Sequence, residues 1–355
     1  MGVKKLLALC RDLWSRMGEE REREKSFLEN GSCVLEALIA SCNGKPIPIR
    51  TFSYDELRWA TNNYEQRHLL DYGSFQEYGC YYELYEGSFE GRTISIKTFM
   101  DPTLSELPIT DLAISAKASA HKNVLKLVGC CLKTRLPTLV FESVENGTLA
   151  ERIYAFDRDG APRQRESMAW RSRLKVAREI AHAITYLHTG FSRPIIHRDI
   201  HADNIFFDQH DIPKLSGFST SILIPEGETQ VKDDAVWGTI GYACPTYCDT
   251  SCITEKTDVY SFGMLLLVLL TGQRACLRGT SDGPKSPNLI NYVRERSEIN
   301  QFVDPAILEG ERGADEQQLQ AVLQLAFICV DKDPETWPTM MDVTKELRRI
   351  GRSVC

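Results

Sequence analysis

The N-terminal region carries two stretches in which apolar residues return every three or four positions, the spacing of one face of an α-helix. In the first stretch the apolar positions are Val3, Leu6, Leu7, Cys10, Leu13, Trp14 and Met17. In the second, from Gly31 to about Ser41, they are Val34, Leu35, Leu38 and Ile39. The turn signal Asn43-Gly44 and the prolines after it end this second helix. We therefore expect residues 1–50 to form a helical extension made of two helices.

The apolar stripe of the second helix must be covered by something. It either packs against the adjacent domain or forms a docking surface for another protein, and both interpretations stay open. The first helix also carries basic residues, which would suit an anionic membrane surface, and the Met-Gly start raises N-myristoylation of Gly2. Leu6 stands where the myristoylation pattern has Ser or Thr, so docking on protein is the favoured reading for this helix.

From about residue 65 the pattern changes to the short, β-branched runs of strands. Glu83–Phe89 and Arg92–Lys97 are joined by a glycine-containing turn and predict an antiparallel hairpin. Val124–Cys131 and Leu136–Phe141 predict two further strands. These runs predict a small antiparallel sheet within residues 51–144.

A polar break at Glu145-Asn146-Gly147 separates this region from long helical patterns such as Trp170–His188. We expect a hinge near Glu142 to Gly147 and a helical lobe over residues 145–355. The chain is therefore predicted to be an α+β protein of two lobes with a helical N-terminal extension.

Charge and cysteine content exclude several classes. The 355 residues contain 42 basic and 49 acidic side chains, a net charge of −7, which excludes a general nucleic-acid-binding protein. Twelve cysteines are too few for a disulfide scaffold and predict reduced, packed thiols in the cytoplasm. The triplet Cys244, Cys248 and Cys252 has no C-x-x-C pair and no nearby histidines, so we expect no metal site. No apolar run is long enough for a signal peptide or a membrane span.

Five motifs in a fixed order then narrow the interpretation. They are His197-Arg198-Asp199-Ile200, Asn204, Lys214–Phe218, Gly238–Tyr242 and Asp258–Gly263. In order and spacing they match the signature set of protein kinases. Over residues 65–350 the chain therefore resembles a eukaryotic protein kinase, which implies a sheet-based N-lobe and a helical C-lobe.

A narrower resemblance is to plant receptor-like cytoplasmic kinases. It is carried by Ala60-Thr61-Asn62-Asn63, Gly129-Cys130-Cys131 and Thr254–Gly263. The preamble resembles the ZRK group of that family, plant immune pseudokinases, in Phe27–Ser32, Cys42–Lys45 and Ile47–Arg50. This resemblance implies a partner, the leucine-rich repeats of a plant coiled-coil nucleotide-binding leucine-rich-repeat receptor (NLR). It also implies that pathogen effectors acylate such pseudokinases, or modify other receptor-like cytoplasmic kinases that these then recruit.

The nucleotide-binding half of the kinase machinery is degraded. Where the glycine-rich loop would read G-x-G-x-x-G, the chain has Glu77, Gly79 and Tyr82, so one glycine of three remains. The strand lysine is present as Lys97, but counting without a gap places Leu112 at the position of its glutamate partner. A shift of one residue would offer the shorter Asp111. The ion pair that positions this lysine is therefore in doubt.

The catalytic half is degraded too. Asp199 and Asn204 keep the positions of the catalytic base and of a metal ligand. The catalytic-loop lysine is His201, which we expect to be mostly neutral at pH 7. The D-F-G motif reads Gly217-Phe218-Ser219, so the main Mg²⁺ carboxylate is missing. Because phosphoryl transfer depends on placed charge, efficient turnover is not expected.

Positions that stabilise the kinase fold are mostly retained. His197, Asp258 and Gly263, which brace the C-lobe of kinases, are kept. A pair that normally forms a buried ion pair is lost from both sides, since Thr246 replaces the glutamate of A-P-E and Trp337 replaces its arginine. Losing both partners avoids an uncompensated buried charge, so the pattern indicates a fold that was maintained after its enzymatic demand was dropped.

We therefore predict a catalytically impaired pseudokinase that acts as an adaptor or sensor subunit of a plant NLR, in the cytoplasm or within a receptor complex at the plasma membrane. No cofactor is required, although weak binding of ATP by Gly79, Lys97 and Asn204 stays open. The candidate docking residues are Val34, Leu35, Leu38 and Ile39. The segment from Gly217 to Tyr247 is the candidate sensor surface. The alternative is an atypical, active Ser/Thr kinase.

Overall fold

The computed structural model describes residues 2–42, 49–75, 79–154, 168–233, 235–276, 288–308 and 315–352; for residues 2–16, 41–42 and 72–80 it describes the backbone alone. The chain divides into two compact units. Residues 1–119 and 126–143 form the N-lobe, and residues 120–125 and 144–355 form the C-lobe. The predicted combination of a sheet lobe, a helical lobe and an N-terminal helix is confirmed.

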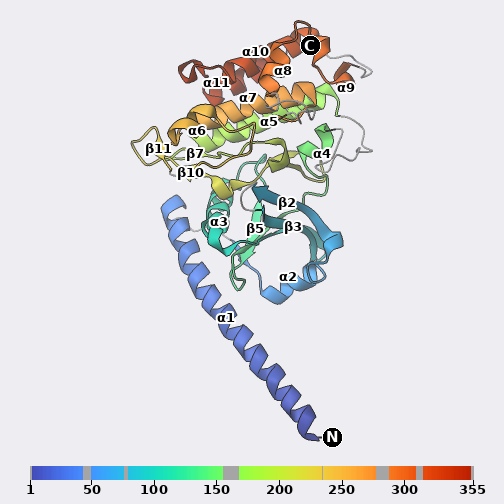
Figure 1. Cartoon of the computed structure of the whole chain (residues 1–355), viewed down its shortest axis with the longest axis vertical. Coiled ribbons are helices and arrows are strands. Elements are labelled where there is room, and N and C mark those ends of the chain that lie inside the picture. Colours follow the sequence, from blue (N-terminus) through green and yellow to red (C-terminus); the bar gives the residue numbers. More distant parts are fainter. Residues whose placement is uncertain are drawn as a thin grey trace, which may run out of the picture. The chain divides into compact units, whose positions relative to one another are not determined.

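The N-terminal extension is one helix, α1 (Gly2–Cys42), and the prediction of two separate helices was wrong (Figure 1). The gap in the apolar pattern is a run of charged residues, which form helices readily. Within that run Arg23 lies 3.5 Å from Glu19, and Lys25 lies 3.7 Å from Glu29, one helical turn apart in each case. The run therefore continues the helix instead of interrupting it.

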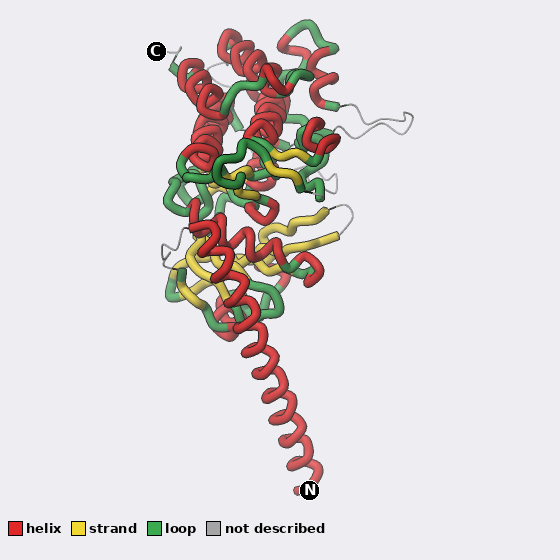
Figure 2. Tube along the Cα trace, turned by 90° about the vertical axis from the view of Figure 1, so that its left-hand side faces the viewer, coloured by secondary structure: helices red, strands yellow, loops and turns green. Residues whose placement is uncertain are grey.

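The C-terminal half of α1 is attached to the N-lobe, where it packs against α3 (Glu106–Ala118). Val34 is buried, and Nδ2 of Asn30 donates hydrogen bonds of 3.0 and 2.9 Å to the carbonyls of Leu132 and Thr134. The guanidinium of Arg23 stacks on the Tyr54 ring at 4.2 Å. Figure 2 shows that the N-terminal half of α1 continues past the lobe to which its other half is bound.

This attachment divides the stripe that the sequence predicted. Val34 is buried and Leu38 half-buried, whereas the side chains of Leu35 and Ile39 are 59% and 55% exposed. Packing against the adjacent domain therefore holds for part of the stripe, and docking of another protein stays a prediction for the exposed part. Val34 contributes to the lobe's own packing, so the predicted four-residue docking surface was wrong at this position; Leu35 and Ile39 remain accessible.

The N-lobe is built on one six-stranded sheet in the order β1-β5-β6-β4-β3-β2. The strands are β1 (Arg50–Thr51), β2 (Leu69–Phe75), β3 (Gly79–Phe89), β4 (Arg92–Phe99), β5 (Leu127–Cys131) and β6 (Thr138–Glu142). All neighbours are antiparallel except β1 and β5. The predicted hairpin is β3–β4, with its turn at Glu90 and Gly91, both at positive φ.

The lead-in to this sheet is held by a capped helix and a close backbone approach. Ser53 and Glu56 form a capping box at the start of α2 (Tyr54–Ala60). Next to it Phe52 packs on β5, where a Cβ at position 129 would lie 2.6 Å from the Phe52 ring and 2.3 Å from the Arg50 carbonyl. Only a glycine at position 129 permits this contact. The close approach therefore explains the glycine of the Gly129-Cys130-Cys131 motif.

The C-lobe is mainly helical. Its helices are α4 (Leu149–Ile153), α5 (Trp170–Thr189), α6 (Pro245–Thr250), α7 (Glu255–Thr271), α8 (Leu289–Arg294), α9 (Pro305–Leu308), α10 (Glu316–Cys329) and α11 (Met340–Ile350). Its short strands are β7 (Ile195–Ile196), β8 (Ile205–Phe207), β9 (Pro213–Leu215), β10 (Ile222–Leu223), β11 (Val231–Lys232) and β12 (Cys252–Ile253). They form the pairs β7–β10, β8–β9 and β11–β12.

Helix α7 is the centre of the C-lobe. Its residues from Thr257 to Thr271 are all buried, as expected from the apolar run within it. It packs against α5 and α10, and α5 in turn packs against α11. A helix that is apolar on all sides needs neighbours on all sides, so α7 fixes the positions of the loops at its N-terminal end, where the catalytic-loop remnants lie. None of the helices described is long and apolar enough to span a membrane.

Candidate functional site

Lys97 is held inside the N-lobe. It lies on β4, 5% exposed, and its Nζ is 2.7 Å from Oδ2 of Asp111 on α3. The ion pair that the sequence left in doubt therefore forms, with the shifted partner Asp111, while Leu112 is buried in the core. Oδ1 of Asp111 also accepts a hydrogen bond of 3.0 Å from the Ser115 hydroxyl. The shorter carboxylate of Asp111 is therefore long enough to reach Lys97.

Aromatic rings cover the same lysine. The Nζ of Lys97 is 4.0 Å from the centre of the Tyr82 ring and 5.1 Å from that of Phe99. Tyr82 stands where the third glycine of the phosphate-binding loop would be, so a ring covers the lysine where a kinase has no side chain. Gly79 begins β3, whereas Glu77 and Tyr78 lie outside the described residues. The ammonium that would meet nucleotide phosphates is thus engaged within its own lobe.

Breaking this buried pair tests how tightly it is engaged. We expect Lys97→Met to lower the free energy of unfolding by about 3 kcal/mol, because Asp111 keeps a buried charge without its partner. Adding Asp111→Leu should restore most of the loss, since two apolar residues replace two charges. Urea unfolding of both variants measures this. Equal stability of Lys97→Met and the unmodified chain would show that the pair is not buried as described.

Asp199 lies in the C-lobe and its carboxylate is already satisfied. Oδ1 accepts a hydrogen bond of 2.6 Å from the Thr239 hydroxyl, and Oδ2 accepts one of 3.0 Å from Nδ2 of Asn204. Nε2 of His201 lies 3.4 Å from Oδ2. Burial opposes its ionisation, but His201 and the Thr239 hydroxyl, with a smaller contribution from His197, hold the pKa of Asp199 well below its usual range. A kinase base must instead accept the proton of a substrate hydroxyl.

His201 is charged, and the prediction of a mostly neutral imidazole at pH 7 was wrong. Burial by itself would lower the pKa of His201, but the neighbouring carboxylates of Asp199 and Asp203 outweigh it and raise the pKa to about 10. The second contact, Nδ1 to Oδ2 of Asp203, measures 3.4 Å. The sequence reasoning considered the free histidine and missed its two acidic neighbours. This imidazolium takes the place of the catalytic-loop lysine but is bound to the base itself.

The raised pKa makes stability depend on pH. Because the folded-state pKa of about 10 exceeds the unfolded value of about 6.5, the stabilisation is complete below pH 6.5 and is lost as pH rises toward 10. We expect the unmodified chain to lose stability between pH 7 and 10 more steeply than His201→Gln, by at most about 1.4 kcal/mol per pH unit. Urea unfolding at pH 6.5, 8 and 9.5 compares the two. Parallel pH profiles would contradict a charged His201.

No carboxylate stands beside Asn204 where the D-F-G motif would supply one. Gly217 has a φ of +84°, and a Cβ built on it would lie 2.5 to 2.6 Å from the Asn204 side-chain atoms. Both protons on Nδ2 of Asn204 are used, by the main-chain and side-chain oxygens of Asp199. The space for an aspartate is therefore filled by the retained metal-ligand residue, and the residues present do not fit the Mg²⁺ site of a kinase.

The segment after Gly217 is tied to the same loop. Nη1 of Arg198 lies 2.7 Å from Oδ2 of Asp233. The Tyr247 hydroxyl accepts a hydrogen bond from the Trp237 amide and donates one to the Ala235 carbonyl. Strand β11 pairs with β12. Thr239 and Asp233 were not singled out from the sequence, although Thr239 belongs to a motif that was noted.

The cysteines whose side chains the structure describes gather in no group of three. Eight cysteines among the described residues carry free thiols, and four of them, Cys130, Cys131, Cys244 and Cys329, are buried. Burial raises the pKa of Cys130 and of Cys329 to about 12. In the part of the chain that the structure describes, no three His, Cys, Asp or Glu side chains gather as metal ligands would.

Comparison with known proteins places this site in a family. Residues 68–347 match the model of protein tyrosine and serine/threonine kinases, so the chain belongs to that family. It is 37% identical to "Serine/threonine-protein kinase ZRK1" of Arabidopsis thaliana over 96% of this chain and 97% of the relative. It is 40% identical to "Non-functional pseudokinase ZED1" of the same plant, over 94% and 98%. The resemblance read from the preamble is thereby confirmed, and the chain is a member of the ZRK group.

A third relative is also named a pseudokinase. "Non-functional pseudokinase ZRK2", also of Arabidopsis thaliana, is 38% identical over 98% of this chain and 97% of its own length. The names of these relatives divide between kinase and pseudokinase, so the group contains chains described in both ways. The residues of this chain's own site must decide which description fits it.

Proposed function

We propose that this chain is a catalytically impaired pseudokinase that works as an adaptor or sensor subunit of a plant NLR. In this proposal it binds the leucine-rich repeats of the receptor and recruits receptor-like cytoplasmic kinases that pathogen effectors have modified. The observation that carries it is the exposed apolar face of a helix that is itself anchored to the N-lobe. A fixed, accessible apolar face is what a protein-binding surface requires.

The face consists of exposed apolar side chains of α1. Along a helix with about 100° per residue, Met17, Leu28, Leu35 and Ile39 fall within about 40° of one another, and all four are more than half exposed. Val34 and Asn30, which attach α1 to the lobe, fall on another side of the helix. We call these four residues the α1 face. Since the helix is attached through other residues, binding on the α1 face would not require α1 to leave the lobe.

The catalytic residues support a binding role over an enzymatic one. Asp199 is satisfied by three neighbours, Lys97 by Asp111 and two rings, and position 217 has no carboxylate. The missing carboxylate at position 217 and the occupied carboxylate of Asp199 each remove an interaction that the transition state of phosphoryl transfer needs, whereas the Lys97–Asp111 pair is one that the chain keeps. The same engagement of Lys97 and Asn204 argues against the weak ATP site at Gly79, Lys97 and Asn204, so we propose that the function needs no nucleotide.

The candidate sensor surface is the segment from Gly217 to Tyr247. Its contacts to Arg198 and Asp199 hold it without added phosphate, since Asp233 supplies a negative charge opposite Arg198. Within it Val236 and Ile240 are 46% and 58% exposed. We propose that effector-modified kinases, or acyltransferase effectors, meet the chain here. The proposed location is the cytoplasm, within a receptor complex that reaches the plasma membrane.

The experiment is affinity purification of the tagged full-length chain from plant tissue, with partners identified by mass spectrometry. An NLR and a receptor-like cytoplasmic kinase among the specific partners are the expected result. A chain that enriches neither, while remaining folded by circular dichroism, contradicts the proposal.

The alternative, an atypical active Ser/Thr kinase, has one observation in its favour. The Lys97–Asp111 pair is formed, and Asp199 and Asn204 are in place. A radiolabelled-phosphate assay with Mg²⁺ and with Mn²⁺ separates the two, with Asp199→Ala as control. Incorporation that Asp199→Ala abolishes would establish the kinase and overturn the proposal of an impaired enzyme. Incorporation equal to that of the control would come from a contaminant.

A further inference from the structure

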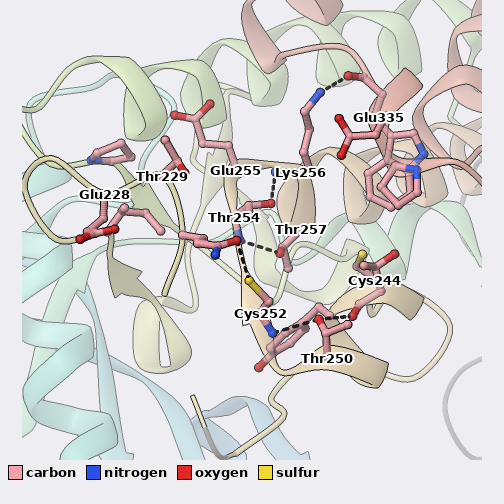
Figure 3. A pocket seen from close by; sticks show the side chains of 17 residues that line it. Glu228, Thr229, Cys244, Thr250, Cys252, Thr254, Glu255, Lys256, Thr257 and Glu335 are labelled. Atoms are coloured by element: carbon pink, nitrogen blue, oxygen red, sulfur yellow. Dashed lines mark hydrogen bonds between the residues drawn. The ribbon is translucent and has the colours of Figure 1, made fainter. Parts of the chain in front are cut away.

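The C-lobe contains an open pocket of about 770 Å³ that the kinase-like site does not use. It lies between α6, β12, the N-terminal end of α7, and the turn around Pro334–Trp337 (Figure 3). We call it the α6–α7 pocket. None of the residues that line it belongs to the Asp199 and Asn204 cluster described above. The role of this pocket therefore has to be explained separately from that of the kinase-like site.

The pocket lies where the A-P-E ion pair is missing. Thr246 and Trp337, which replace its two partners, both line the pocket. Without that pair the wall is held in another way, because Nζ of Lys256 donates hydrogen bonds to the carbonyls of Trp337 and Pro338. Trp337 is 4% exposed, packs on the Tyr260 ring at 5.5 Å, and donates from Nε1 to the Asp331 carbonyl at 2.9 Å. The wall is thus fixed before anything binds.

The floor of the pocket is apolar and aromatic. It includes the buried side chains of Ile224, Cys244, Tyr247 and Trp337. Tyr247 also fixes the preceding segment through Trp237 and Ala235. A preformed apolar floor next to polar groups is the usual composition of a binding pocket.

The rim is acidic. Of the 17 lining residues, Glu228, Glu255 and Glu335 carry negative charge and Lys256 alone carries positive charge, a difference of two charges. Figure 3 shows Glu255 and Glu335 on either side of the Lys256 side chain. Since the Lys256 ammonium is bonded to main-chain carbonyls, it does not form an ion pair with these carboxylates in the described structure. The pocket therefore presents an acidic rim over an apolar floor.

We propose that the α6–α7 pocket binds a basic segment of a partner protein. An arginine or lysine of that segment would pair with the Glu255 and Glu335 carboxylates, and an adjacent apolar side chain would lie on the floor by Tyr247 and Trp337. Charge complementarity selects this occupant, because acidic peptides would be repelled. The inference rests on the chain being a binding protein, but not on the α1 face, which belongs to the other lobe.

The test uses two synthetic heptapeptides with a fluorescent label, one with three arginines alternating with four leucines, and one with glutamate in place of each arginine. Binding to the full-length chain is followed by fluorescence anisotropy at 50 and 300 mM NaCl. We expect the arginine peptide to bind, more weakly at the higher salt concentration, and the glutamate peptide not to bind.

The variant Glu255→Gln/Glu335→Gln should weaken binding of the arginine peptide about ten-fold, through the loss of charge-assisted hydrogen bonds. The matched control is Glu295→Gln/Glu298→Gln, which removes two exposed charges from the same lobe outside the pocket. The control should bind as the unmodified chain does. Equal weakening in both variants would mean attraction to net charge alone and would overturn the proposal, as would an arginine peptide that does not bind. Either failure leaves receptor binding through the α1 face unaffected.

Discussion

Leu35→Glu/Ile39→Glu should abolish co-purification of the receptor while leaving the melting temperature unchanged within about 2 °C. Both side chains are more than half exposed, so their replacement removes little from the fold. At an interface they would be desolvated, and two buried carboxylates in place of two aliphatic side chains should weaken binding by about 100-fold or more. The measurement is quantitative co-purification from plant tissue, with differential scanning calorimetry of the purified variant.

Two further variants make this result specific. Trp59→Glu changes a large apolar residue of the same lobe that is 80% exposed on α2, and should leave receptor binding intact. Val34→Glu places a charge where α1 packs on α3 and should lower both binding and melting temperature. If Trp59→Glu also abolishes co-purification of the receptor, the receptor binds exposed apolar side chains of the lobe without specificity for the α1 face. If Leu35→Glu/Ile39→Glu retains the receptor, the α1 face is not the docking surface.

The sequence predicted much of the site because kinase motifs carry roles position by position. The predicted lobes and the hairpin of β3 and β4 are present, and the absence of a carboxylate at Gly217 can be read from the sequence alone. These features depend on residue type and order. None of these features depends on how distant segments pack, so the sequence pattern alone was enough to predict them.

Where segments distant in sequence must meet, the sequence was insufficient. Counting along the chain could not decide between Leu112 and Asp111, because the choice depends on how α3 rotates against β4; the structure selects Asp111. The charge of His201 depends on two carboxylates that approach it only in the fold. The α6–α7 pocket likewise needs Thr246 and Trp337, about 90 residues apart in the chain, to line one space.

A physical criterion separates the kinase-motif residues that are kept from those that have changed. Residues whose loss would leave a buried polar group unsatisfied are kept, whereas residues that serve only substrate or metal have changed. Gly217 and His201 belong to the second class. The Asn204 side chain fills the space beside Gly217, and the carboxylates of Asp199 and Asp203 pair with the charge of His201. Asp258, one of the two aspartates that the motif set keeps, belongs to the first class and gives the strongest test of this division.

Asp258→Ala should lower the free energy of unfolding by about 5 kcal/mol, because three buried donors lose their acceptor at once. The Asp258 carboxylate is fully buried at the start of α7. Oδ2 accepts from Nε2 of His188 at 2.8 Å and from the His197 amide at 2.9 Å, and Oδ1 accepts from the Arg198 amide at 2.9 Å. These bonds fix the catalytic loop, including Arg198 at its positive φ of +69°. Urea unfolding followed by circular dichroism gives the value.

Asp258→Asn provides the graded control, since its single oxygen can still accept from His188 and the His197 amide while its NH₂ group faces the Arg198 amide. We expect it to cost about 2 kcal/mol, between the unmodified chain and Asp258→Ala. Asp199→Ala, which changes the residue at the position of a kinase's catalytic base, leaves donors such as the Thr239 hydroxyl nearer to solvent and should cost less than Asp258→Ala. If Asp199→Ala proved the more destabilising of the two, the retained residues would not be those that the scaffold needs, and the explanation of this chain as a maintained fold with a lost reaction would fail.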